Sequence, residues 1–206
     1  MISSEEFASR WSVLHSNAST SGIVGAWLRI SYRFGLICTL LRISPNVLTI
    51  FGLLAAIGTA ITALSPWAII LIVASLFFDG IDGSVAIFQH RENAWGALLD
   101  SVVDRISEAL WLYSLYLVGV PAKIAIGIWL VAAIQEYARA RAESLGVHEI
   151  GVVTLTERPV RASFIFVALL MFQLSIPGVT VLSIAFLVLH IFSAFQVMRF
   201  SYGQLR

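Results

Sequence analysis

The sequence has little charge and a single cysteine, and each shortage excludes a class of protein. Asp, Glu, Lys and Arg make up only 12% of the 206 residues, whereas soluble domains carry roughly 25%. Cys38 alone forms no internal disulfide and no cysteine-based metal site. The net charge is only +1, whereas nucleic-acid-binding proteins carry a clear excess of basic residues. We therefore expect no nucleic acid among the partners.

Long stretches contain no charged residue at all. These stretches are residues 43–78, 109–122 and 162–198, in a chain that is 59% hydrophobic. Each reaches or approaches the roughly 20 apolar residues that cross a hydrocarbon core. The runs are continuous rather than alternating, which favours helices over a β-barrel. The sequence therefore predicts an all-α integral membrane protein.

Five prolines divide the apolar part of the chain. Proline is tolerated in the first turn of a helix and breaks a helix interior, so each proline indicates a helix start. The predicted transmembrane helices are residues 45–64, 67–88, 96–118, 121–142, 159–175 and 178–199. We expect these six spans in a single membrane domain, residues 23–206, after a polar N-terminal segment, residues 1–22.

Residues 23–43 differ from the later stretches because arginines alternate with apolar side chains. Arg29 and Arg33 lie four residues apart, so one face of a helix here is basic and the other is apolar. This pattern is typical of an amphipathic helix that lies in the membrane interface. The alternative is a first spanning helix.

The basic residues predict the orientation in the membrane. The side that carries both termini has Arg10, Arg29, Arg33, Arg42, Arg91, Arg139, Arg141, Arg158, Arg161, Arg199 and Arg206. The opposite side has only Lys123, and Arg105 lies within the third span. By the positive-inside rule, we expect a multi-pass protein of the cell membrane with both termini in the cytoplasm.

Four aspartates lie in apolar helices, where a charged side chain is costly. Asp79 and Asp82 belong to the second predicted span, and Asp100 and Asp104 belong to the third. A carboxylate at the bilayer centre costs roughly 2.5–3.5 kcal/mol on insertion scales, so such residues indicate function. Spacings of three and four residues place each pair on one helix face. A short link makes the helices antiparallel neighbours, so we expect the pairs to face each other.

Facing carboxylates repel one another unless cations lie between them. Oxygen ligands suit Mg²⁺, Mn²⁺ or Ca²⁺, and two divalent ions bridged by carboxylates serve phosphoryl transfer. The alternative is an acidic cluster neutralised by basic residues, with Arg105 as the obvious partner. One arginine does not neutralise four aspartates, so we favour a metal site.

The residues around these aspartates resemble the signature of the CDP-alcohol phosphotransferase family. The family pattern is D-x-x-D-G-x-x-A-R, eight residues, then G-x-x-x-D-x-x-x-D, and seven of its eight fixed positions match. The matching residues are Asp79, Asp82, Gly83, Ala86, Gly96, Asp100 and Asp104. The resemblance implies six spanning helices after an interfacial helix, and a homodimer.

The resemblance also implies roles for these residues. The four aspartates would hold two Mg²⁺ or Mn²⁺ ions, and Asp104 would also act as general base. The donor would be a CDP-linked lipid such as CDP-diacylglycerol, bound by Asp82, Gly83, Ala86, Gly96, Arg91 and Thr49. A hydroxyl of a small hydrophilic alcohol would attack the lipid-side phosphorus, and CMP would leave.

The chain departs from the family pattern at Ile87, where the pattern has arginine. By resemblance, that arginine lies beside the nucleotide and the diphosphate. Arg91 follows four residues later, on the same face if the helix continues. We hypothesise that Arg91 compensates for the missing charge.

A second group of arginines lies at the predicted cytoplasmic helix ends, and arginine holds phosphate through a planar fork of donors. Any single one is equally consistent with a positive-inside anchor. Their segments resemble the bacterial phosphatidylinositol-phosphate synthase branch of the family. That likeness implies an acceptor-phosphate site made of Arg139, Arg158, Arg161, Arg199 and, from the first span, Asn46.

The sequence thus predicts a metal-dependent phospholipid synthase of the membrane with a phosphorylated acceptor, inositol phosphate or glycerol phosphate. Two alternatives stay open. One is a cation transporter that uses the aspartates as its ion site, although we find neither the inverted repeats nor the broken helices of such transporters. The other is a catalytically inactive relative, for which Ile87 is the only support.

Overall fold

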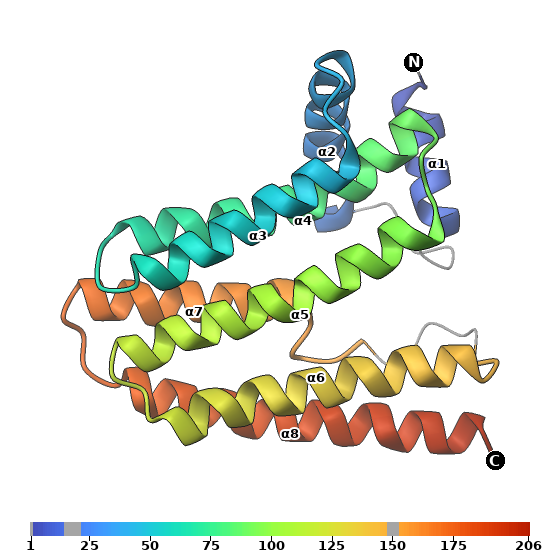
Figure 1. Cartoon of the computed structure of the whole chain (residues 1–206). Coiled ribbons are helices and arrows are strands. Elements are labelled where there is room, and N and C mark those ends of the chain that lie inside the picture. The colour runs from blue at the N-terminus through green and yellow to red at the C-terminus, as the bar shows by residue number, and fades with distance from the viewer. Residues whose placement is uncertain (1, 15–21, 148–152) are drawn as a thin grey trace. The chain divides into compact units, whose positions relative to one another are not determined.

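The computed structural model describes residues 2–14, 22–147 and 153–206, and these residues form helices and no strands (Figure 1). The helices are α1 (Ser4–Leu14), α2 (Gly22–Leu40), α3 (Pro45–Ile61), α4 (Trp67–Gln89), α5 (Ala94–Leu117), α6 (Ala122–Ser144), α7 (Arg158–Gln173) and α8 (Val179–Gln204). The all-α class is confirmed, and α2 to α8 correspond one by one to the predicted helices. Only α1 was not predicted, because its segment is polar.

Five helices end in the same tight turn. A residue one or two positions after the end of the helix has a positive φ in each case: Arg42, His90, Gly119, Gly146 and Ser175. Its N–H bonds to the carbonyl three residues back, and the next N–H bonds to the carbonyl five residues back. This is the Schellman motif, which satisfies the last carbonyls of a helix. It explains why α2, α4, α5, α6 and α7 stop where they do.

The prolines lie where the next helices start, as the sequence predicted. Pro45 is the first residue of α3, Pro121 is the N-cap of α6, and Pro159 is the second residue of α7. A proline at such a position gives up an N–H that would have no partner within the helix. The α4 and α8 helices likewise begin just after Pro66 and Pro177.

The chain divides into two compact units, and the division falls within α3, α4 and α5. The first unit is Met1–Leu54 with Ala74–Asp104, and the second is Ala55–Val73 with Arg105–Arg206. Each unit is described by itself below.

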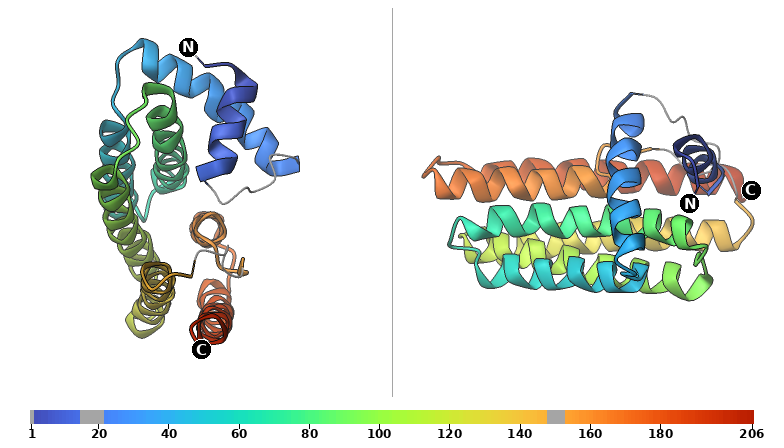
Figure 2. Two further views of the ribbon diagram at one scale, coloured as in Figure 1. Left: turned by 90° about the vertical axis from the view of Figure 1, so that its right-hand side faces the viewer. Right: turned by 90° about the horizontal axis from the view of Figure 1, so that it is seen from above.

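In the first unit, α3 and α4 approach closely. The Ser75 hydroxyl donates to the Gly52 carbonyl over 2.8 Å, and a Cβ at Gly52 would lie 3.3 Å from the Ser75 backbone carbonyl oxygen. The α2 axis is bent by 112° from that of α3, and the Gln89 amide donates to the Ile43 carbonyl over 2.7 Å. The short α1 helix packs on α2, as Figure 2 shows.

In the second unit, α6 and α7 both pack against α8. Phe164 of α7 stacks on Phe186 of α8 with ring centroids 3.7 Å apart. The Trp129 indole N–H of α6 donates to the Arg105 carbonyl of α5 over 3.1 Å. These contacts hold the helices that carry the arginine segments.

By length and composition, two helices of the described chain are able to cross a membrane, namely α4 and α8. A third span results if the bent pair of α2 and α3 counts as one. The α7 helix has 16 residues and α3 has 17, short of the roughly 20 that a perpendicular span requires. The α5 and α6 helices are longer but include several charged side chains.

The turn after α7 generates a stability prediction. Ser175 adopts φ 55°, a left-handed conformation that glycine adopts without strain. We expect Ser175→Gly to raise the free energy of unfolding by about 1 kcal/mol. The matched control is the reverse change at the equivalent turn of α5, Gly119→Ser, where φ is 100°; it should lower stability. Thermal unfolding in detergent measures both, and a loss of stability in Ser175→Gly would contradict the prediction.

Candidate active site

Three of the four aspartates meet in the first unit. Carboxylate oxygens of Asp79, Asp100 and Asp104 all lie within 4.8 Å of one another. Asp79 lies on α4, whereas Asp100 and Asp104 lie one turn apart on α5. The structure thus brings the two helix faces together, as the spacing of the aspartates predicted. Carboxylates this close are a set of hard oxygen ligands suited to a divalent cation.

The fourth aspartate, Asp82, lies one turn after Asp79 and is held separately. It is only 7% exposed. One carboxylate oxygen accepts a hydrogen bond from the Thr49 hydroxyl, and the other accepts one from the Gly83 N–H at 2.6 Å. Asp100 and Asp79 repel a negative charge on Asp82. Thr49 therefore orients Asp82, a role that the sequence did not predict.

A cavity of about 410 Å³ opens beside these carboxylates in the first unit. Every residue predicted to bind the donor lines it: Asp82, Gly83, Ala86, Gly96, Arg91 and Thr49. Asp79 and Asp100 line it too, and so does Asn46, which was grouped with the acceptor arginines. Asp104 is not among the lining residues and lies one turn farther along α5.

Two small residues keep the cavity open. A Cβ built on Gly83 would meet no atom within 4 Å, so helix packing does not require glycine there. A Cβ at Gly96 would lie 3.6 Å from the Asn93 side-chain oxygen. Asn93 is the N-cap of α5, since this oxygen accepts the Gly96 N–H over 2.8 Å. The space at Gly83 is therefore available to a ligand.

Ile87 and Arg91 differ in their surroundings. Ile87 is 2% exposed and belongs to a buried apolar cluster, whereas Arg91 is exposed; both residues line the cavity. The condition of a continuing helix is not met, because α4 ends at Gln89 and His90 turns the chain. Arg91 reaches the cavity from the link between α4 and α5.

In the second unit, the arginine segments form a network with three glutamates. Glu108 of α5 is 2% exposed, and the Arg161 side chain lies 2.8 Å from it and 2.9 Å from Glu136. Arg161 also donates to the Thr156 carbonyl over 2.9 Å. Arg105 lies 2.9 Å from Glu108 as well. Buried charges persist when they are paired and hydrogen-bonded in this way.

Glu108 was missed in the sequence, although it is a carboxylate within an apolar stretch. Its signal is the spacing of three residues from Arg105, which predicts an ion pair on one helix face. The sequence indicated Arg105 as the obvious partner for the aspartates. Its close contact with Glu108 gives it a structural role in the second unit.

The other predicted acceptor arginines are more accessible than Arg161. Arg158 is 4.0 Å from Glu108, and its guanidinium lies 5.5 Å from the centre of the Trp111 ring. Arg199 is exposed near the end of α8. Of the two, Arg199 is the more accessible, since the Arg158 side chain is 14% exposed.

Arg139 is fixed by a two-pronged ion pair with Glu157. Its two terminal nitrogens donate to the Glu157 oxygens over 2.9 and 2.6 Å. Burial alone would raise the pKa of Glu157, but hydrogen bonds from Arg139 and from Thr154 outweigh burial and lower that pKa to about 2. The stabilisation is therefore present above the ordinary pKa of 4.5 and is lost as the pH falls toward 2.

Comparison with known proteins identifies the family. The sequence model of the CDP-alcohol phosphatidyltransferases matches residues 42–197. The archaetidylinositol phosphate synthase of Aeropyrum pernix is 37% identical over 171 residues, which cover 80% of this chain and 87% of the relative.

Two crystal structures of the phosphatidylinositol phosphate synthase of Mycobacterium tuberculosis share the fold. The structure with CDP-DAG bound gives a TM-score of 0.71 at 21% identity and covers 84% of this chain and 94% of that one. The complex with manganese and citrate gives 0.68 at 20% identity, with coverages of 84% and 88%. The chain therefore belongs to the CDP-alcohol phosphatidyltransferases, divalent-cation-dependent membrane enzymes that transfer a phosphatidyl group from a CDP-linked lipid to an alcohol.

Proposed function

We propose that this protein transfers the phosphatidyl group of a CDP-diacylglycerol-type lipid to an inositol phosphate and releases CMP. The observation that carries the proposal is the cavity of the first unit, which is lined by Asp79, Asp82 and Asp100 together with the small residues Gly83 and Gly96. The names of the relatives support the acceptor, because both are synthases of an inositol phosphate lipid.

The aspartates fit a divalent cation. Mg²⁺ binds oxygen at about 2.0–2.1 Å, so two ligand atoms on opposite sides of the ion lie about 4.2 Å apart. The oxygens of Asp79, Asp100 and Asp104, all within 4.8 Å of one another, come close to this spacing. With Asp82 they would hold two Mg²⁺ or Mn²⁺ ions. Such a pair neutralises the negative charge of a diphosphate.

Side chains of the protein bind the donor and take up the proton in the rest of the reaction. Gly83 and Ala86 leave room for the nucleotide, and Arg91 supplies a positive charge at the same cavity. Asp104 takes the proton of the acceptor hydroxyl while the oxygen of that hydroxyl bonds to the lipid-side phosphorus. The bond from that phosphorus to the bridging oxygen breaks, and CMP leaves with the oxygen. No covalent enzyme intermediate is needed.

The arginines of the second unit would hold the phosphate of the acceptor. Arg199 is exposed and Arg158 lies 4.0 Å from Glu108, whereas Arg161 and Arg139 contact glutamates at 2.8 and 2.6 Å. We therefore assign direct phosphate contact to Arg158 and Arg199, and orientation of the site to Arg161 and Arg139.

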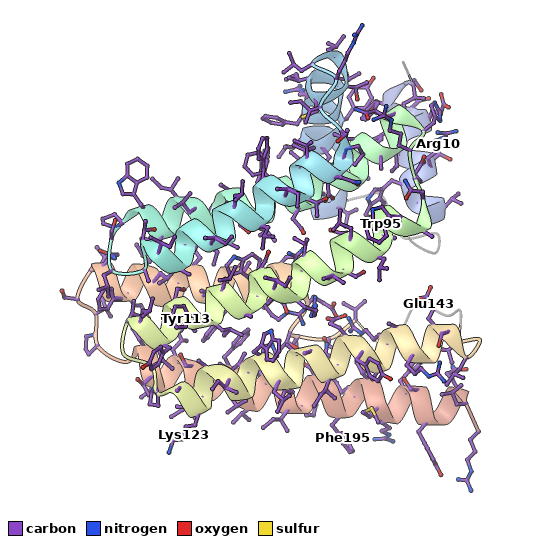
Figure 3. The ribbon with its side chains drawn as sticks, viewed as in Figure 1. Arg10, Trp95, Tyr113, Lys123, Glu143 and Phe195 are labelled. Carbon is purple, nitrogen blue, oxygen red and sulfur yellow. The ribbon has the colours of Figure 1, made fainter. Side chains whose placement is uncertain are left out.

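The membrane arrangement is part of the proposal. We propose that α3 to α8 are six spanning helices, that α2 lies in the interface, and that both termini and the active site face the cytoplasm of the cell. Lys123 lies at one end of α6 and Glu143 at the other, beside Arg139 and Arg141 in sequence (Figure 3). This asymmetry agrees with the positive-inside rule. The homodimer implied by the family belongs to the same proposal.

The function is tested by CMP release from the purified protein in detergent, with CDP-diacylglycerol and Mg²⁺ or Mn²⁺. We expect release with inositol phosphate, but not with glycerol phosphate, inositol or serine, and complete loss with a chelator. Asp100→Asn should abolish turnover and metal dependence together. Asp104→Asn should lower turnover by about 10²–10⁴-fold and spare binding of the CDP-lipid.

The control is Glu143→Gln, which removes an exposed carboxylate outside the cavity and should leave CMP release unchanged. Release with glycerol phosphate alone would reassign the acceptor. Near-normal turnover in Asp100→Asn or Asp104→Asn would refute the role given to that residue.

Gly83→Ala distinguishes an effect on donor binding in the cavity from an effect on the stability of the fold. Because an added methyl group meets nothing at Gly83, we expect the free energy of unfolding to rise by about 0.5–1 kcal/mol from better helix propensity. The same methyl group narrows the cavity, so the KM for the CDP-lipid should rise. Gly203→Ala in α8 is the matched control, since its Cβ would also meet nothing. An unchanged donor KM in Gly83→Ala would place the nucleotide elsewhere.

We predict two classes of arginine, one that binds the phosphate of the acceptor and one that stabilises the fold. Arg158→Gln and Arg199→Gln should raise the KM for inositol phosphate far more than the KM for the CDP-lipid. Arg161→Gln should instead destabilise the protein by about 3–5 kcal/mol, because Glu108 is left buried with less compensation. Adding Glu108→Gln should restore part of that stability. Equal effects of Arg158→Gln and Arg199→Gln on both KM values would argue for anchoring rather than acceptor binding.

A further inference from the structure

The N-terminal helix α1 is anchored on the first unit by a buried aromatic side chain. Phe7 is 1% exposed, and its ring stacks on Phe88 with centroids 5.0 Å apart and planes 13° from parallel. The Tyr32 hydroxyl of α2 donates to the Ile2 carbonyl over 3.2 Å. Burying a phenylalanine stabilises a structure by about 1.5–3 kcal/mol. A segment that is polar by composition is thus packed against α2 and α4.

Ile87 is part of the apolar surface against which α1 packs. The buried cluster consists of Phe7, Leu28, Ile87 and Phe88. Ile87 is the residue that replaces the arginine of the family pattern. An arginine would bring a charge into this apolar cluster, and a buried charge is costly unless it is paired. The isoleucine, which also lines the donor cavity, therefore suits the packing of α1 on this cluster.

The docked helix brings a tryptophan to the donor cavity. Trp11 follows Phe7 by four residues, so both lie on one face of α1. Trp11 packs against the cluster around Ile87, and it lines the same cavity as Asp79 and Gly83. An indole presents a flat aromatic face on which a nucleobase is able to stack.

A polar contact fixes α1 to the turn that carries Arg91. The Arg10 guanidinium lies 2.8 Å from Nδ1 of His90, and Figure 3 shows Arg10 on α1. Arginine only donates, so Nδ1 of His90 accepts. His90 has φ 50° and turns the chain between α4 and Arg91. The α1 helix thus holds the segment from which Arg91 reaches the cavity.

We propose that α1 is part of the donor site, that Trp11 binds the cytidine of the CDP-lipid by stacking, and that Ile87 belongs to the apolar surface that holds α1 in place. The proposal rests on the proposed function for the identity of the ligand. The substitution at residue 87 is then an exchange of one contact to the donor for another. It is not a sign of lost activity.

The test is calorimetric binding of CDP-diacylglycerol to the full chain in detergent with Mg²⁺, alongside CMP release. We expect Trp11→Ala to weaken donor binding about 10-fold and to leave the KM for inositol phosphate unchanged, while Trp11→Phe keeps most of the affinity. Trp95→Ala is the matched control, because Trp95 is 64% exposed and does not line the cavity. Unchanged donor binding in Trp11→Ala would overturn the proposal.

The apolar contact between α1 and Ile87 is tested with Ile87→Arg and Phe7→Ala. Both should weaken donor binding as much as Trp11→Ala does, and Phe7→Ala combined with Trp11→Ala should be no worse than either alone. Ile87→Val should bind normally. Tighter donor binding in Ile87→Arg would overturn the proposal, since the family arginine would then have restored a lost contact. Wild-type protein that binds the donor but releases no CMP with any acceptor would instead refute the proposed function.

Discussion

The structure depends on one constraint, the presence of carboxylates in apolar helices. A membrane-embedded chain places charge there only at considerable cost, and the two units compensate it in different ways. In the second unit, Glu108 lies against Arg161 and Arg105, so the charge is balanced within the protein. In the first unit, Asp79, Asp100 and Asp104 bring like charges together beside a cavity. Like charges at that distance favour a cation between them.

This difference assigns separate tasks to the two clusters. The arginine–glutamate network fixes helix ends of the second unit, and the exposed Arg199 lies near the end of α8. The aspartates and the cavity of the first unit hold the residues predicted to bind the donor. Thr49 and Gly83 orient Asp82 through hydrogen bonds, so its carboxylate is positioned before any ligand arrives. Such preorganisation is how a site stabilises developing charge without rearranging.

Much of this could be predicted from the sequence, because helix signals in this chain are local. Prolines and uncharged runs define α3 to α8, and the spacing of Asp79, Asp100 and Asp104 predicts that they converge. The condition attached to Arg91, that the helix continue as far as this residue, is not met, since α4 ends two residues before it in a turn at His90. A left-handed histidine has no sequence signal comparable to that of glycine.

Other features depend on contacts between distant residues and could not be predicted. Phe7 is one aromatic residue in a polar segment, and its burial against Ile87 and Phe88 depends on how α1 packs on α2 and α4. The ion pair of Arg139 with Glu157 likewise joins α6 to the start of α7. Composition suggested only that these arginines are basic anchors or ligands. The tertiary partners decide which of them are available to an acceptor.

Manganese binding tests the central claim most directly, because it needs neither donor nor acceptor. Bound Mn²⁺ loses the sharp electron paramagnetic resonance spectrum of the free ion, so titration of the purified protein counts the bound ions. Our account predicts that the wild type and Glu143→Gln bind two Mn²⁺ ions per chain. It predicts that Asp79→Asn combined with Asp100→Asn abolishes that binding. Folded wild-type protein that binds no Mn²⁺, or a double variant that binds as the wild type does, would contradict the account.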